Sequence, residues 1–485
     1  MAEESFKKKS ISGVGWSATD AILSQGTSFI LGLVLARLLT PEDYGLIGIV
    51  MIFVSVFGSV VDCGFSTAII RKHDANDADY NTMFYTNIIF SIVLYICLVL
   101  SSPVIASFFG RNELKQLIPF LGGILVINAL SLTQYTILTK RVDFKTKTKA
   151  SFISSSISGV VGIICAYMGH GVWALVWQRL LQQTIYTMLL WIYNKWTPSF
   201  RWSRKSFNYL WGFGWKMLLS GILNSVWTQI YHIVVGKFYK PETLGQYTRA
   251  RDYANIFSSN LTMIVQRVSF PVLSEMQNEK ERMIAAYRKV IKLTMFITLI
   301  CMFSLGAISE PLIKCLIGDK WIESSTYLPL ICISMSLYPL HAINLNMLQV
   351  QGKSGVFLYL EFIKKFVSTG PILLGIFVSI KVMLIGSIIA GLISYFLNSY
   401  YTGKDLNYNS WMQINDVKSS FAIAIIIALS VYFFKYLPCS AYVILTIQII
   451  IGSLIFFIIC ETSKPSEYIE IKSIALSIIN KREIR

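Results

Sequence analysis

The chain has 485 residues, of which 54% are hydrophobic and only 14% charged, and it carries a formal net charge of +17. A soluble chain would hold about 25% charged residues, so this composition excludes an ordinary soluble protein and indicates a membrane protein. The lysines and arginines are spread over many separate segments, and we expect no nucleic acid partner despite the net charge.

The apolar residues come in blocks long enough to cross a bilayer, because a hydrocarbon core of about 30 Å needs a helix of about 20 residues. The blocks do not alternate between apolar and polar residues, as the strands of a membrane barrel do. We therefore predict an all-α polytopic membrane protein with about fourteen transmembrane helices. The predicted spans are 14–38, 44–70, 80–102, 117–139, 150–168, 172–194, 210–236, 245–270, 289–309, 326–350, 356–379, 382–401, 418–437 and 440–460.

The positive charges are distributed unevenly between the two sides that fourteen crossings define. Most of the 43 lysines and arginines lie in the segments before odd-numbered helices and after the last one, as in 140–149 and 201–205. Loops rich in Lys and Arg stay in the cytoplasm. We therefore predict that both termini are cytoplasmic.

Two stretches about 200 residues apart repeat each other. Gly13–Trp16 precedes an apolar block and Leu39–Gly45, and Gly212–Trp215 precedes an apolar block and Tyr239–Gly245. Two like halves that rock against each other are typical of transporters, and six helices in each half predict a parallel repeat. The predicted parts are a six-helix lobe at 1–200, a six-helix lobe at 201–405, two extra transmembrane helices at 406–462, and a cytoplasmic tail at 463–485.

The tail carries apolar residues at helical spacing. Tyr468, Ile471, Ala475 and Ile478 share one face of a helix over 467–480. This pattern is typical of an interfacial amphipathic helix on the membrane surface, and a frayed tail is the alternative.

Charged and polar residues within the spans are the candidate functional residues, because a charge at mid-bilayer costs about 3 kcal/mol. One span, 210–236, carries a polar residue at every fourth position, which predicts a polar stripe along one helix face. Together with polar and charged residues in four other spans, this stripe predicts a water-filled cavity with a positive wall. The predicted substrate-binding residues are Gln178, Arg179, Lys216, Asn224, Thr228, His232, Arg249 and Arg251, and the predicted coupling residues are Asp20, Asp62 and Asp252.

Structural roles compete with these assignments. Arg249, Arg251 and Asp252 lie near a helix end and have the spacing to pair with one another or reach the membrane surface. Asp62 has Arg71 as a candidate partner, and Asp20 has the position of a capping or pairing residue near the cytoplasmic surface. These alternatives remain open in the sequence.

Other chemistry finds no support in the sequence. The eight cysteines form no CxxC pair and lie mostly in apolar blocks, which is typical of small hydrophobic residues. The histidines have no partner at metal-ligand spacing. The glycines of 13–18 follow no strand, so they do not form a dinucleotide site. We expect no metal, no cofactor apart from a coupling proton or sodium ion, and no enzymatic activity.

Three segments resemble a known family. Ala36–Gly45, Asp62–Phe65 and Leu244–Ala250 are similar to the Wzx-type oligosaccharide flippases of bacterial surface-polysaccharide clusters. The overall pattern resembles the superfamily that also holds multidrug exporters and lipid II flippases. The resemblance covers nearly the whole chain, and the family has no strict catalytic signature.

The resemblance implies a function. Such a protein would move an oligosaccharide linked to undecaprenyl pyrophosphate across the bacterial cytoplasmic (inner) membrane by alternating access, for O-antigen, capsule or exopolysaccharide synthesis. A polysaccharide polymerase and glycosyltransferases would be its partners. The alternatives are a lipid II-type flippase and a cation-coupled multidrug exporter of the same fold.

Overall fold

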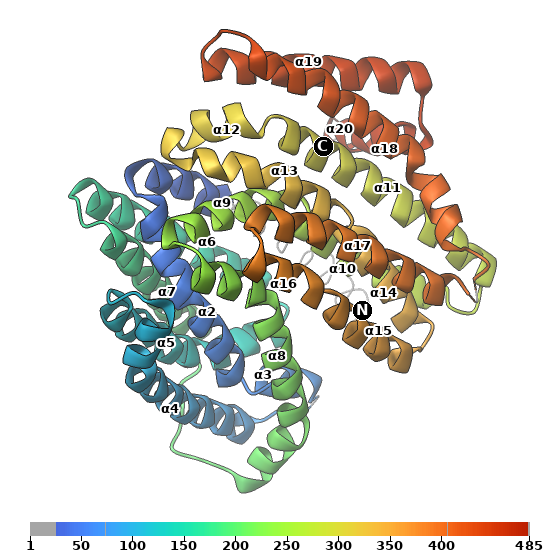
Figure 1. Cartoon of the computed structure of the whole chain (residues 1–485). Helices are drawn as coiled ribbons and strands as arrows, with labels where there is room; N and C mark the ends of the chain where they lie inside the picture. Colours follow the sequence, from blue (N-terminus) through green and yellow to red (C-terminus); the bar gives the residue numbers. More distant parts are fainter. Residues whose placement is uncertain (1–25, 73, 405, 484–485) are drawn as a thin grey trace. The chain divides into compact units, whose positions relative to one another are not determined.

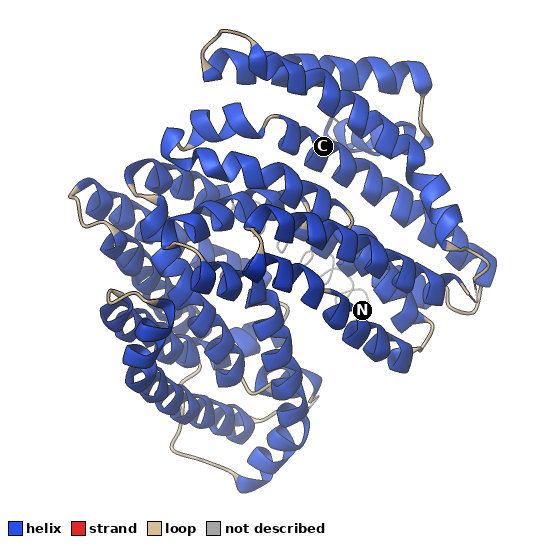
Figure 2. Ribbon diagram, viewed as in Figure 1, coloured by secondary structure: helices blue, strands red, loops and turns tan. Residues whose placement is uncertain are grey.

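The computed structural model describes residues 26–72, 74–404 and 406–483, and within these ranges the chain is helical and contains no strand (Figures 1 and 2). After a first helical segment, Gly26–Leu38, the helices up to the middle of the chain are α2 (Pro41–Val61), α3 (Phe65–Arg71), α4 (Asp77–Phe109), α5 (Leu114–Lys140), α6 (Phe144–Tyr167), α7 (Val172–Asn194), α8 (Arg204–Phe238) and α9 (Pro241–Phe257). They are followed by α10 (Ser259–Glu275), α11 (Lys280–Ala307), α12 (Ser309–Leu316), η1 (Asp319–Trp321), α13 (Ile322–Ser336), α14 (Tyr338–Val350), α15 (Ser354–Val367), α16 (Thr369–Phe377), α17 (Ile380–Gly403), α18 (Ser410–Tyr432), η2 (Phe433–Tyr436), α19 (Ala441–Ser463) and α20 (Ser466–Glu483).

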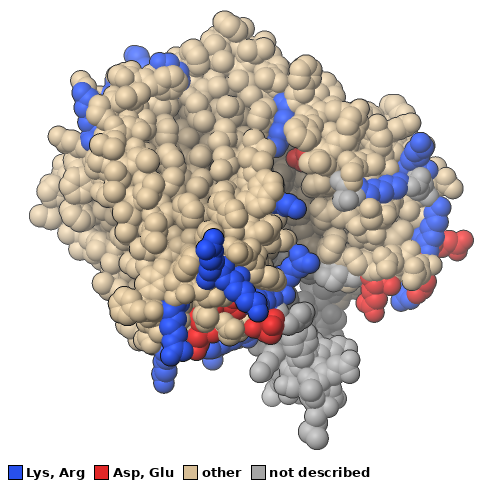
Figure 3. Space-filling view, turned by 90° about the horizontal axis from the view of Figure 1, so that it is seen from below, with Lys and Arg blue, Asp and Glu red and all other residues tan. Residues whose placement is uncertain are grey.

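The all-α membrane fold predicted from the sequence is confirmed. Among the described residues, 10 helical segments are long and apolar enough to cross a membrane, and each coincides with a predicted span. Many large apolar side chains on them are exposed, such as Leu100 and Val104, and uncharged residues cover most of the face seen in Figure 3. Lipid is the environment that suits such a surface.

The other four predicted spans differ from these ten. The span 14–38 lies partly outside the described residues, and its described part is the helix Gly26–Leu38. The span 172–194 is the helix α7, which carries Arg179 and three glutamines among its apolar residues. The spans 245–270 and 356–379 are each divided between two helices, α9 with α10 and α15 with α16. Fourteen crossings remain compatible with this arrangement.

Two helix starts in the first half, those of α2 and α4, are fixed by reciprocal side-chain caps. The hydroxyl of Thr40 accepts the backbone N–H of Asp43, whose carboxylate accepts the backbone N–H of Thr40. Asn76 and Asp79 form the same reciprocal pair at the start of α4. Such a capping box satisfies two N–H groups that the helix leaves unpaired.

The helices divide into two compact units, residues 1–248 and 249–485, and the division falls within α9. Residues 204–248, which the sequence repeat assigns to the second lobe, therefore belong with the first half of the chain in packing. The physical reason is that α8 packs along α2 and contacts α3 and α4. The lobes at 1–200 and 201–405 remain predictions of the sequence repeat.

The first unit is built from helix pairs. α4 packs along α5, and α6 along α7. The indole N–H of Trp191 on α7 donates to the backbone oxygen of Leu130 on α5 at 2.9 Å, and a methyl group at Gly159 of α6 would clash with Leu31. Small residues allow this close approach of helices.

The core of the second unit lies between α11, α14, α17 and α18. It contains a fully buried polar network, in which Asn344 accepts a hydrogen bond from the Tyr287 hydroxyl at 2.7 Å and exchanges two with the amide of Gln413. Buried polar groups need such partners, because each unpaired one costs about 1–3 kcal/mol.

The predicted tail helix is present as α20, and two residues of its apolar face pack against other helices. Tyr468 and Ile471 pack against Phe296 of α11 and Cys460 of α19. The Tyr468 hydroxyl donates to Glu461 at 2.7 Å, and Lys472 also pairs with Glu461. This hydrogen bond raises the pKa of the Lys472 ammonium group. Tyr468 and Ile471 thus contribute to helix packing, and the interfacial position of the tail stays a prediction of the sequence.

Candidate functional site

The polar stripe of the sequence forms one face of α8 in the first unit. Lys216, Asn224 and Thr228 are exposed on this face, and His232 is half-buried near its end. The Thr228 hydroxyl donates to the backbone oxygen of Asn224 at 2.8 Å, and the ring of His232 lies 5.4 Å from that of Tyr247. A helix long and apolar enough to span a membrane thus carries an exposed hydrogen-bonding face. Such a face needs water or a polar ligand.

A break between α2 and α3 lies against this helix. Cys63 and Gly64 have positive φ angles of 49° and 69°, so the chain turns sharply here. A methyl group at Gly214 of α8 would come within 2.4 Å of the Cys63 backbone oxygen, and one at Gly64 within 2.6 Å of Met217. The two backbones therefore touch beside Lys216, and only glycine permits this.

Asp62 occupies the same break. Its carboxylate accepts the backbone N–H of Ser66 at 3.2 Å and the Ser66 hydroxyl at 2.5 Å. Ser66 in turn accepts a hydrogen bond from Thr136 of α5 at 3.0 Å. The pairing of Asp62 with Arg71 that the sequence left open is not found, since the Arg71 guanidinium lies 5.4 Å from the centre of the Phe213 ring.

The candidates on α7 contact neighbouring helices. Gln178 packs closely on Gly162 of α6, and Gln182 donates to Ser155 of the same helix at 3.1 Å. Arg179 is exposed. Of the predicted pair, only Gln178 is thus shown to take part in helix packing.

The remaining described candidates belong to the second unit. Arg249 forms an ion pair with Asp252 at 3.7 Å, and its guanidinium lies 5.9 Å from the centre of the buried Trp321 ring. This is one of the pairings that the sequence left open. Arg251 follows on the same helix, and Asp20 lies outside the described residues.

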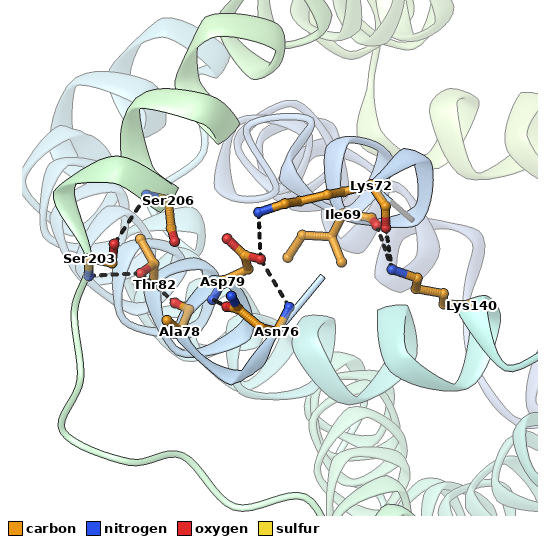
Figure 4. A network of polar contacts seen from close by, with 9 residues as sticks. All are labelled: Ile69, Lys72, Asn76, Ala78, Asp79, Thr82, Lys140, Ser203 and Ser206. Atoms are coloured by element: carbon orange, nitrogen blue, oxygen red, sulfur yellow. Dashed lines mark hydrogen bonds and ion pairs between the residues drawn. The ribbon is translucent and has the colours of Figure 1, made fainter. Parts of the chain in front are cut away.

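A polar network at the start of α4 and α8 was not predicted from the sequence (Figure 4). Asp79 is fully buried and pairs at 2.8 Å with Lys72, the residue that follows α3. Lys140 of α5 donates to the backbone oxygens of Ile69 and Lys72. The backbone N–H of Ser203, the cap of α8, donates to Thr82 at 3.1 Å. The network joins α3, α4, α5 and α8. The Asn76 and Asp79 spacing, a capping-box pattern, was the signal that could have located it.

Aromatic residues add further contacts between α8 and the helices of this polar network. The rings of Phe90 and Trp211 stack at 6.2 Å, and Lys72 lies 5.0 Å from the centre of the Tyr209 ring. The segment before α8 is also held, because Ser199 exchanges two hydrogen bonds of 2.8 Å with the Asn81 amide. The start of α8 is therefore fixed to α3 and α4, and this positions its polar face.

The second unit contains a comparable charged cluster. Asp416 of α18 binds the guanidinium of Arg288 through two bonds of 2.8 Å and accepts the Tyr408 hydroxyl at 2.7 Å. Burial raises the pKa of the Tyr408 hydroxyl. The cluster joins α11 to α18 and has the character of a structural anchor.

An apolar cavity of about 270 Å³ lies between α11, α18 and α19, lined by residues such as Ile300, Ile427 and Phe456. Its lining suits a hydrocarbon chain better than a sugar or a phosphate. Within the described residues no group of three or more His, Cys, Asp and Glu has the arrangement of a metal site.

Comparison with known proteins finds relatives whose names refer to polysaccharide biosynthesis. The profile of a family described as "Polysaccharide biosynthesis protein" matches residues 34–326. The succinoglycan biosynthesis transport protein ExoT of Rhizobium meliloti is 23% identical over 75% of this chain and 73% of its own length. The teichuronic acid biosynthesis protein TuaB of Bacillus subtilis is 28% identical over 63% of this chain and 64% of its own length. The lipopolysaccharide biosynthesis protein WzxC of Escherichia coli is 22% identical over 68% of this chain and 67% of its own length.

Solved structures share the fold at lower identity. The lipid II flippase MurJ, in an inward closed conformation, aligns with a TM-score of 0.72 at 16% identity over 92% of this chain and 97% of its own. An inward-facing multidrug transporter of the MATE family aligns with a TM-score of 0.62 at 16% identity over 80% of this chain and 99% of its own.

Proposed function

Since the chain belongs to the polysaccharide biosynthesis protein family, we propose that it is a flippase for a lipid-linked oligosaccharide. Its cargo is an oligosaccharide on undecaprenyl pyrophosphate, which it moves across the bacterial cytoplasmic membrane for surface polysaccharide synthesis. The observation that carries the proposal is the exposed polar face of α8 in a helix of membrane-spanning length. Both termini lie in the cytoplasm. Glycosyltransferases act before the flippase, and a polymerase acts after it.

The polar face of α8 is suited to a sugar head group. Each sugar hydroxyl that loses water without gaining a partner costs several kcal/mol in hydrocarbon, so crossing requires a polar path. Asn224 and Thr228 offer donors and acceptors one helical turn apart, within reach of successive hydroxyls. The polyprenyl chain needs no such path and stays in lipid or against apolar side chains.

The diphosphate is recognised by cations. Lys216 is exposed at one end of the polar face of α8, and the guanidinium groups of Arg179, Arg249 and Arg251 match phosphate oxygens in a two-pronged geometry. We assign Lys216 to the first contact with the diphosphate. Each such charge-assisted hydrogen bond contributes about 1.5–3 kcal/mol.

A coupling ion would act through the acidic candidates. Asp62 lies at the α2–α3 break beside α8 with its carboxylate bonded to Ser66, so a change in its charge would alter the break. A proton or a sodium ion is the coupling ion of this proposal, with Asp20 and Asp252 as the other acceptors. Replacing Asp62 by Asn is expected to remove the dependence of transport on the pH or sodium gradient.

The experiment is complementation of a deletion strain. Lys216→Ala, Arg249→Ala and Arg251→Ala should each lower surface polymer by about tenfold or more, since 1.4 kcal/mol corresponds to tenfold in binding, and Lys216→Arg should restore most of it. Lys381→Ala, an exposed lysine of α17, is the control. Normal polymer with all three alanine variants would show that these cations do not bind the substrate.

A lipid II-type flippase is the second candidate, favoured by the TM-score of 0.72 with MurJ. Rescue of a strain depleted of its lipid II flippase, without any effect on surface polymer, would favour that reading. Drug efflux is the third, and a cationic drug would need an acidic rather than a basic binding surface.

A further inference from the structure

The two copies of the sequence repeat meet each other in the first unit. α2 begins at Pro41 and α9 at Pro241, and their first turns cross at Gly45 and Gly245. A methyl group at Gly45 would lie 1.8 Å from the Pro241 backbone oxygen, and one at Gly245 would lie 1.9 Å from the Pro41 backbone oxygen. The contact is thus reciprocal, with each repeat presenting the same glycine to the same proline carbonyl of the other.

This crossing leaves no room for any side chain. Real Cβ atoms essentially never come closer than 3.0 Å to another heavy atom in such positions. Further along α2, a methyl group at Gly48 would lie 3.5 Å from the Leu244 side chain and 3.9 Å from the Thr248 hydroxyl, which is ordinary contact. The capping box of Thr40 and Asp43 fixes the first turn of α2. The backbones of α2 and α9 therefore touch at this crossing.

The charge distribution assigns this crossing to one side of the membrane. α8 begins at Arg204, close to Arg201 and Lys205, on the side rich in positive charge, and it ends at Phe238, three residues before α9. By the positive-inside rule, the start of α8 is cytoplasmic. The crossing of α2 and α9 therefore lies at the opposite, outer end.

We propose that Gly45 and Gly245 are positioning residues for transport, because their lack of side chains permits the closed state of the outer end. This proposal rests on the proposed function, because it requires that a substrate head group leaves through the outer end. The reciprocal contact is the surface that separates when the outer end opens. A side chain at either glycine holds the helices apart and shifts the population toward the open state.

The test measures exposure of the polar face from outside. A cysteine at Thr228 is introduced after Cys97→Ser and Cys439→Ser remove the exposed native thiols, and intact cells are treated with a membrane-impermeant maleimide. Gly45→Ala and Gly245→Ala should each raise labelling of the cysteine at position 228 by about tenfold, the effect of 1.4 kcal/mol on a two-state equilibrium. Gly123→Ala, in a helix with open space around the glycine, should leave labelling unchanged.

A second pair of variants covers the case in which the alanine variants do not fold. Gly48→Cys together with Thr248→Cys places two thiols across the crossing, and a short thiol crosslinker should lock the outer end closed. Labelling at position 228 should then fall, and polymer export should stop until the link is cleaved. Folded alanine variants with unchanged labelling, or a crosslinked protein that still exports, would overturn the proposal. Labelling needs no substrate, so a shift in labelling without any effect on export would contradict the flippase function and leave the outer contact standing.

Discussion

The buried ion pair between Lys72 and Asp79 should be the most sensitive polar contact of the first unit. The Asp79 side chain is fully buried and that of Lys72 is 19% exposed, and their atoms are 2.8 Å apart. Lys72→Met would leave a buried carboxylate without its cation. Removing one partner of a buried pair costs about 3–5 kcal/mol, so we expect a loss of this size in the free energy of unfolding.

The matched control is an exposed pair in the second unit. Arg282 and Glu279 lie 3.1 Å apart with side chains 65% and 58% exposed, and an exposed pair contributes about 0–1 kcal/mol. Unfolding of the purified protein in detergent would be followed by tryptophan fluorescence for Lys72→Met, Arg282→Met and the double variant Lys72→Met with Asp79→Asn.

The double variant decides the physical cause. If the uncompensated carboxylate is responsible, the double variant should be more stable than Lys72→Met alone, because the neutral amide that replaces the carboxylate at position 79 no longer needs a cation. Equal losses for Lys72→Met and Arg282→Met would refute the argument that burial makes this pair important.

Three further predictions concern packing and hydrogen bonds. Gly214→Ala should destabilise the first unit by about 1–3 kcal/mol, because its methyl group would lie 2.4 Å from the Cys63 backbone oxygen. Gly221→Ala in the same helix meets open space and should leave the stability unchanged. Thermal unfolding of the two variants compares them. Tyr408→Phe removes a bond to the Asp416 carboxylate and should cost about 1.5–3 kcal/mol, visible as faster proteolysis near α18. Trp191→Phe loses the bond to Leu130 and should cost about 0.5–1.5 kcal/mol, and an unchanged unfolding midpoint would show that water replaces the carbonyl.

The sequence was sufficient for the all-α membrane fold, because long apolar runs are a local pattern of residues. It showed Pro41–Gly45 and Pro241–Gly245 as copies, yet it could not show that these copies touch. A helix crossing depends on how two rigid rods are placed in space, and a glycine in an apolar run has many explanations.

Side-chain partners were predicted less well. For Asp62, the sequence offered a distant charge, Arg71, but the carboxylate instead bonds to Ser66, four residues on. Local hydrogen bonds compete well with ion pairs when a chain turns sharply. For the tail, the sequence predicted an apolar helix face on the membrane surface, and Tyr468 and Ile471 of this face pack against other helices. Amphipathic periodicity reports that a face is buried, and not what buries it.

In the candidate site, too, the sequence predicted features of a single helix but not contacts between helices. The exposed stripe on α8 was visible from its spacing of four residues, because a single helix suffices to place Lys216 and Thr228 on one face. The network around Asp79 was missed, since it joins α3, α4, α5 and α8. Residues far apart in the chain meet there, and only the capping pattern of Asn76 and Asp79 was local.

The most direct measurement uses a bacterial host with this gene deleted. Polyprenyl-pyrophosphate-linked oligosaccharide in its lipid extract is quantified by mass spectrometry after intact cells have been treated with an impermeant sugar-reactive reagent. The account predicts that unlabelled, cytoplasm-facing repeat units accumulate and surface polymer is lost, and that the wild-type gene but not Lys216→Ala reverses both. Normal amounts and normal labelling of the lipid-linked oligosaccharide, with intact surface polymer, would contradict the flippase function.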